Sequence, residues 1–129
     1  MTPQPMIVVR DVQASSRWYQ AVLGLRSRHG GPEYEQLMAG DRLVLQLHHP
    51  DVHEHPHLGS PEAGPCGLGV VLWFHEPAIV TAHLRAPQAG AQVLKPLKLN
   101  PLANHREFWL RDPDGYVVVV AGAYGDTGE

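Results

Sequence analysis

Residues 105–120 constrain the fold more than any other stretch, because two apolar runs flank a strong turn sequence. The runs are rich in aromatic and β-branched residues, and Asp-Pro-Asp-Gly at residues 112–115 separates them. Proline presets φ and glycine supplies a positive φ, so the stretch predicts a β-hairpin. In the first arm Phe108 and Leu110 alternate with polar side chains and Trp109, which gives that arm one apolar face. The second arm is an unbroken run of valines and favours a strand covered on both faces.

Length, charge and cysteine content fit a single domain in a reducing compartment. At 129 residues the chain can bury a core without disulfides, and its one cysteine, Cys66, excludes an intrachain disulfide. A formal net charge of −3 without a basic run argues against a nucleic-acid partner. No apolar run approaches the ~20 residues of a membrane span, and the amino terminus lacks a secretion signal. We therefore expect a cytoplasmic protein without a membrane partner.

The first half of the chain predicts a strand, a helix and two linked strands. Residues 6–9 form a short apolar strand. Asp11 suits a helix N-cap and Gly24 suits a helix end, which predicts a helix of about three turns between them. Residues 34–38 and 43–48 follow as strands. The second of these alternates leucines with polar side chains, so its polar side chains look away from the core that takes the leucines.

The second half repeats this order after a loop. Residues 49–67 hold repeated Pro, His and Gly without an apolar period and predict a loop. Residues 67–74 predict a strand, with Trp73 on the face opposite to its apolar neighbours. Residues 91–94 predict a short strand, and residues 95–104 a loop that contains proline.

A second helix is expected to begin at Glu76 and Pro77, because proline is favoured at the first helical position, where its missing N–H costs no hydrogen bond. Pro87 is expected to end it early. The predicted apolar stripe of this helix consists of Ile79, Val80, His83 and Leu84. The two halves thus form an internal repeat of elements, and neither half could close a core alone.

Several short motifs in this order resemble a known superfamily. Asp11-Val12 with Ser15, Trp18-Tyr19 and Leu23-Gly24-Leu25 precede Asp-Pro-Asp-Gly-Tyr at residues 112–116. Together they resemble the vicinal oxygen chelate superfamily, which contains glyoxalase I, extradiol dioxygenases, fosfomycin-resistance enzymes and bleomycin-resistance proteins. The resemblance covers nearly the whole chain.

The resemblance implies an α+β fold of two tandem βαβββ modules, whose sheets curl around a central cleft with the helices on the outer face. It implies one domain over residues 1–129 and, often in this superfamily, a homodimer. The expected parts are module one at about 4–49, a loop at about 50–66, module two at about 67–122 and a flexible tail at about 123–129.

In metal-dependent members of the superfamily, four ligands come from symmetric strand positions. The resemblance places Gln4, Gln46, Gly69 and Val119 at these positions. Two of the four have no ligating side chain, and the other two are neutral amides, which bind divalent cations weakly. We therefore expect no metal and no other cofactor at this centre.

A second possible metal site comes from histidines. Five of them gather near one loop: His48, His49, His53, His55 and His57. Such tracts can bind Zn²⁺, Ni²⁺ or Cu²⁺, but this spacing matches no defined ligand pattern. A solvated loop with adventitious metal binding is the favoured reading, and a divalent metal held by His48 with His105 or Glu107 is the weaker one.

The alternation of side chains along the strands predicts a cleft suited to a small molecule. Its walls are indoles, its floor consists of valines, and a few polar side chains could bind the ligand. The side chains expected to bind the ligand are Gln46, His48, Val71, Trp73, Glu107, Trp109, Val117 and Val119. Indole faces favour aromatic or cationic ligands, and a carboxylate favours a positive one. The alternative is a purely structural role, in which both tryptophans fill the hydrophobic core.

The leading hypothesis is a metal-independent binding protein, similar to the bleomycin-resistance branch, that sequesters an aromatic or cationic compound. The alternative is a lyase, isomerase or dioxygenase-like enzyme with an atypical metal site, or with Glu107 or His48 as general base. A third class, a structural or regulatory subunit with a vestigial cleft, also fits the fold.

Overall fold

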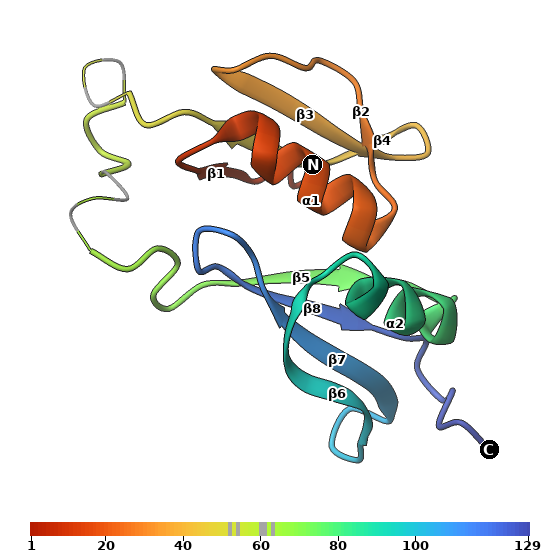
Figure 1. The fold of residues 1–129 in the computed structure, drawn as a ribbon. Helices are drawn as coiled ribbons and strands as arrows, with labels where there is room; N and C mark the ends of the chain where they lie inside the picture. The colour runs from red at the N-terminus through yellow and green to blue at the C-terminus, as the bar shows by residue number, and fades with distance from the viewer. Residues whose placement is uncertain (52, 54, 60–61, 63) are drawn as a thin grey trace. The chain divides into compact units, whose positions relative to one another are not determined.

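The structure is a computed structural model that describes residues 1–51, 53, 55–59, 62 and 64–129. It divides into two units, Met1–Cys66 and Gly67–Glu129. Each unit contains one helix and one four-stranded sheet (Figure 1). The expected α+β fold of two tandem modules is confirmed. We call the two parts the first unit and the second unit.

The first unit consists of β1 (Met6–Val8), α1 (Val12–Leu23), β2 (Arg26–Ser27), β3 (Tyr34–Ala39) and β4 (Arg42–His48). The strand order in the sheet is β1-β4-β3-β2, with β1 parallel to β4 and the other pairs antiparallel. Helix α1 packs against β2, β3 and β4.

Local chemistry sets both ends of α1, as the sequence predicts. The Asp11 side chain accepts a hydrogen bond from the Ala14 backbone N–H at 2.9 Å, which satisfies one of the free donors of the first turn. Gly24 ends the helix with φ at 72°, a left-handed conformation that glycine adopts without a steric penalty.

The second unit consists of β5 (Val71–His75), α2 (Ile79–Gln88), β6 (Gln92–Asn100), β7 (His105–Arg111) and β8 (Val117–Ala121). Its strand order, β5-β8-β7-β6, repeats that of the first unit, with β5 parallel to β8. Helix α2 packs against β6, β7 and β8. Neither helix among the described residues has the length and apolar character needed to cross a membrane.

The predicted hairpin is present as β7 and β8. In its turn, Asp112 Oδ1 accepts hydrogen bonds from the backbone N–H groups of Asp114, at 2.9 Å, and Tyr116, at 2.8 Å. Gly115 has φ at 100°, so the turn needs glycine there. The valines of β8 are almost completely buried, apart from Val117 at the start of the strand.

The strand predicted for residues 67–74 begins later, at Val71. Gly67 has φ at 75°, and a Cβ atom at this residue would lie 2.6 Å from the ring of Tyr116. Residues 67–70 therefore form a turn that fits against the buried tyrosine ring, and the backbone N–H of Val70 bonds to the carbonyl of Gly67 at 3.0 Å. Leu68, which lies within the predicted strand, is 78% exposed.

The predicted stripe of α2 is wrong in part. Ile79 is buried as expected, but Val80 and Leu84 are exposed, and Ala82 and Ala86 take the inner positions. Small side chains at those positions let the helix lie close to the sheet. Pro87 lies inside the helix, which ends one residue later, so the missing proline N–H interrupts only the last turn.

The loop predicted for residues 95–104 is mostly strand, because β6 extends to Asn100. Its pairing with β7 is irregular between Lys95 and Lys98, and Pro96 lies in that irregular segment. β6 is an edge strand, so proline there removes no hydrogen bond that a further strand would need.

Candidate functional site

Four residues in register form a row across the second sheet, which we call the indole row. Trp73 pairs with Val119, Val119 with Trp109, and Trp109 with Lys95. Paired residues on neighbouring strands project from the same face of a sheet. The side chain of Phe108, next to Trp109 in the chain, meets His83 of α2 with ring centroids 5.9 Å apart. The indole row therefore lies on the face away from the helix, as strand alternation predicts.

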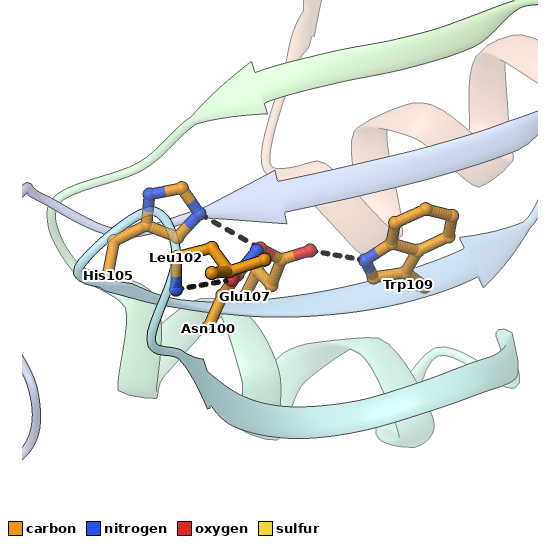
Figure 2. Close-up of polar contacts among 5 residues, drawn as sticks. All are labelled: Asn100, Leu102, His105, Glu107 and Trp109. Atoms are coloured by element: carbon orange, nitrogen blue, oxygen red, sulfur yellow. Dashed lines mark hydrogen bonds and ion pairs between the residues drawn. The ribbon is translucent and has the colours of Figure 1, made fainter.

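Glu107 lies two residues before Trp109 on β7, on the same face of the sheet. It holds three side chains by hydrogen bonds (Figure 2). Trp109 Nε1 donates to Oε2 at 2.5 Å. Asn100 Nδ2 donates to Oε1 at 2.8 Å, and the Nε2 atom of His105 lies 2.9 Å from the same oxygen. Because a carboxylate can only accept, His105 carries its proton on Nε2. The backbone N–H of Leu102 bonds Asn100 Oδ1 at 3.1 Å, which fixes the amide that faces Glu107.

These contacts keep Glu107 ionised although it is only 8% exposed. Burial raises the pKa of the Glu107 carboxyl, but the hydrogen bonds from Trp109, Asn100 and His105, with the charge of His105, lower it below the usual value. A carboxylate with a lowered pKa and both oxygens occupied is a weak proton acceptor. The geometry thus disfavours Glu107 as a general base and makes it a group that positions Trp109 and His105.

The charge around the indole row is mainly positive. Lys95 Nζ lies 4.3 Å from the centroid of the Trp109 ring, a cation–π contact. Lys98 pairs in register with Glu107. Arg111 pairs in register with Val117, and its Nη1 atom donates to the carbonyl of Gly115 at 2.9 Å.

Solvent exposure differs along the indole row. Trp73 on β5 is 50% exposed, and its ring meets His105 at a centroid distance of 5.8 Å. Trp109 is half-buried, whereas Val119 between the two tryptophans is fully buried. Val71, the residue of β5 paired with Val117, is 44% exposed. The two indoles thus lie on either side of a valine that is itself fully covered.

The remaining predicted ligand-binding residues, Gln46 and His48, lie on β4 in the first unit. Gln46 Nε2 donates to the backbone carbonyl of Gln4 at 2.9 Å, and the Tyr34 hydroxyl donates to Gln46 Oε1. Gln36 Nε2 in turn donates to the Tyr34 hydroxyl at 3.0 Å. These side chains lie on the face opposite to that of Glu35, whose carboxylate bonds Ser16 of α1.

The superfamily's metal does not fit the four positions implied for it. Val119 is a buried hydrocarbon, and Gly69 lies in the turn before β5 and has no side chain. Both polar atoms of the Gln46 amide already have partners, as described above. Among the described residues, no group of three or more His, Cys, Asp or Glu side chains is arranged to hold a metal. The pairing of His48 with His105 or Glu107 would need residues from both units.

Sequence reasoning missed several groups of this site. Lys95 and Asn100 fell in a segment predicted to be a loop, and His105 was considered only as a metal ligand. Tyr34 in the first unit was seen only as a strand residue. The single available signal was the aromatic and polar pattern of residues 105–109, which marks the His105, Glu107 and Trp109 face but not what lies beside it.

The sequence profile of the Glyoxalase/Bleomycin resistance protein/Dioxygenase superfamily matches residues 3–120. The chain belongs to this superfamily. Solved glyoxalase-fold structures agree. A protein of unknown function from Agrobacterium tumefaciens str. C58 is 21% identical, with 95% of this chain and 94% of that chain covered and a TM-score of 0.77. A glyoxalase/bleomycin resistance protein/dioxygenase family enzyme from Burkholderia phytofirmans PsJN is 22% identical, with 92% and 96% covered and a TM-score of 0.74.

A resistance protein shares the glyoxalase fold as well. Fosfomycin Resistance Protein FosX from Mesorhizobium loti is 14% identical, with 95% of this chain and 92% of that chain covered and a TM-score of 0.68. At these identities the likeness shows the fold alone. No curated protein matches the chain in sequence.

Proposed function

We propose that this glyoxalase-superfamily protein binds a planar aromatic small molecule at its indole row, without a metal. The observation that carries the proposal is the fixed Trp109 indole, held by Glu107 at 2.5 Å, two strands away from the half-exposed Trp73. Two strand spacings put these residues about 10 Å apart. Two successive aromatic contacts span about 9–14 Å between ring centroids, so one planar ring can stack between the indoles.

The charges on this face favour a neutral or anionic compound over a cationic one. Lys95 already lies over the Trp109 ring, where a ligand cation would otherwise bind. Glu107, the group expected to attract a cation, already accepts hydrogen bonds from three donors on its two oxygens. Lys98 and Arg111 add positive charge along the same face. The proposal therefore keeps the aromatic ligand expected from the sequence and assigns it a neutral or negative charge.

The biological role we propose is sequestration of a toxic compound, as in the bleomycin-resistance branch, by a homodimer. The FosX relative shows that a resistance protein shares this fold. Burial of aromatic surface supplies the binding free energy in this proposal, and no bond needs to be broken.

Tryptophan fluorescence tests the proposal. The probes are naphthalenesulfonate, naphthol and naphthylmethylammonium, which share one planar ring system and differ in charge. We expect quenching by the first two and weaker binding of the cation. Trp73→Phe should weaken binding a few-fold, because a phenyl ring offers less stacking surface than an indole. Trp18→Phe, a substitution on α1 outside the indole row, is the control and should bind as wild type. Absence of quenching by all three probes, or equal losses in both variants, would count against the proposal.

One observation favours an enzymatic function as the second candidate. The Glu107 carboxylate holds the His105 Nε2–H at 2.9 Å, which leaves His105 Nδ1 free of this contact and orients the ring as in a carboxylate–histidine pair. In this reading His105 is the base and Glu107 the group that positions it. Recovery of a bound compound chemically unchanged after long incubation favours sequestration, whereas conversion that is lost in His105→Gln favours catalysis.

A further inference from the structure

Two histidines of the first unit approach each other through the same ring atom. His48 Nε2 at the end of β4 lies 3.2 Å from His55 Nε2 in the following loop. The two rings are perpendicular, with centroids 4.4 Å apart. This contact lies outside the indole row and outside the positions that the superfamily uses for its metal.

The hydrogen bond on the other side of the His48 ring indicates which nitrogen of the neutral ring carries the proton. His48 Nδ1 lies 2.6 Å from the backbone carbonyl oxygen of His49. A carbonyl can only accept, so Nδ1 carries the proton of the neutral ring and Nε2 presents a lone pair. Metal-bound histidines are fixed in this way, because a backbone carbonyl that holds one ring nitrogen orients the other toward the metal.

The loop places His55 by its own hydrogen bonds. The backbone N–H of His55 bonds the carbonyl oxygen of Asp51 at 2.8 Å, and the Asp51 side chain accepts from the N–H of His53 at 3.1 Å. The carbonyl of His55 then accepts from the N–H of Leu58 at 3.1 Å. These bonds hold the backbone at His55, whose imidazole meets that of His48 at the end of β4.

The surroundings favour a cation. A hollow of about 460 Å³ adjoins the pair and is lined by Glu33, Tyr34, His48, His49, Pro50, Asp51 and His53. Two of the lining residues are carboxylates, Glu33 and Asp51, and none of the described lining residues is a lysine or arginine. Negative charge around imidazole ligands raises their affinity for divalent cations.

We propose that His48 and His55 form a two-imidazole site for a late first-row divalent cation, Zn²⁺, Ni²⁺ or Cu²⁺. Two zinc–nitrogen bonds of about 2.0–2.1 Å at a tetrahedral angle hold their nitrogens about 3.3 Å apart, and the observed separation is 3.2 Å. Imidazole is the ligand that these metals accept most readily. Solvent or a small anion fills the remaining coordination positions.

Calorimetric titration of the full, tag-free chain with ZnCl₂ or NiCl₂ tests the proposal. We expect one equivalent to bind with a dissociation constant on the order of micromolar, and His48→Gln and His55→Gln each to weaken binding about tenfold or more. His57→Gln removes an exposed histidine of the same loop and should bind as wild type. Since His55 lies in a loop, its variant should keep the wild-type fold even where the strand variant does not.

The outcomes separate a metal site from a simple hydrogen bond between two imidazoles. A dissociation constant weaker than about 1 mM in the wild type overturns the proposal. Wild-type affinity in the His55→Gln variant overturns it as well, as does an equal loss in the His57→Gln control. A shift of the His48 and His55 ring resonances on addition of Zn²⁺, with the other histidines unchanged, supports it independently of affinity.

Discussion

Glu35 in the first unit and Glu107 in the second are both buried carboxylates with several donors, but they hold different kinds of group. Glu35 accepts from Ser16 Oγ at 2.8 Å, Ser27 Oγ at 2.7 Å and the Gly30 N–H at 2.7 Å, with further bonds from the N–H groups of His29 and Gln36. Most of these donors belong to the backbone or to helix α1.

Glu107 holds only side chains, and it does so on the opposite side of its sheet. Its donors are Trp109, Asn100 and His105, all on β6 and β7 and none on the helix. One carboxylate therefore ties a helix and a loop to a sheet, whereas the other arranges a surface. The comparison teaches that a buried carboxylate with several donors can tie a helix to the sheet in one repeat and order side chains on the opposite face of the sheet in the other.

Truncation of the two carboxylates should separate these roles most clearly. Glu35→Ala leaves buried hydroxyl and N–H donors unpaired, so we expect a loss of about 3 kcal/mol in the free energy of unfolding. Glu107→Ala should cost about 1.5 kcal/mol, because its donors are fewer and nearer to solvent. Urea unfolding measures both values, and Glu33→Ala, a change at an exposed neighbour, serves as the control. Equal costs at the two carboxylates would break the comparison.

Acid should act on both carboxylates in the same direction and more gently than truncation. Burial raises the pKa of the Glu35 carboxyl, but bonds from Gly30, Ser27, Ser16 and Gln36 lower it below 4.5. The pKa of Glu107 is lowered too. A group with a lower pKa in the folded state adds stability that is present above the unfolded pKa and lost as pH falls through the folded pKa.

Stability of the wild type should therefore be flat above about pH 6 and fall below the unfolded pKa of 4.5. Glu35→Gln and Glu107→Gln each remove one of these titrations, so their urea midpoints should fall less steeply with acid. Midpoints that decline in parallel with the wild type in both variants would show that neither carboxylate is linked to folding.

Much of the fold follows from chemistry confined to short stretches. Asp11 and Gly24 bound α1 because capping depends only on neighbouring residues. The turn after β7 follows from Asp112 and Gly115 in the same way. Parity along β7 also places Trp109 away from α2, since alternation is a property of the strand itself.

The features that sequence reasoning missed depend on position in the sheet. Pro96 argues against a strand unless the strand lies at an edge, and edge position is set by the whole topology. Because the sequence predicts a loop for residues 95–104, it does not place Lys95 beside Trp109 or Asn100 beside Glu107. The contact between His48 and His55 likewise depends on a loop turn that has no apolar period.

The turn between β3 and β4 and the turn between β7 and β8 allow a finer comparison, because in each an arginine side chain binds the carbonyl of a glycine with positive φ. Arg26 Nη2 donates to the Gly40 carbonyl at 2.8 Å, and Arg111 Nη1 donates to the Gly115 carbonyl at 2.9 Å. A Cβ atom at either glycine would meet nothing within 4 Å. The φ angles are 61° at Gly40 and 100° at Gly115.

Only the first of these angles lies in the left-handed region that asparagine tolerates. Gly40→Asn should therefore cost less than about 0.5 kcal/mol, whereas Gly115→Asn should cost about 1 kcal/mol or more, as thermal unfolding would measure. Because an added Cβ atom meets no neighbouring atom at either site, any difference in stability between the two variants reports the backbone conformation alone. Equal costs would mean that the second turn relaxes toward the geometry of the first, and the two repeats would then be more alike in these turns than in the surroundings of Glu35 and Glu107.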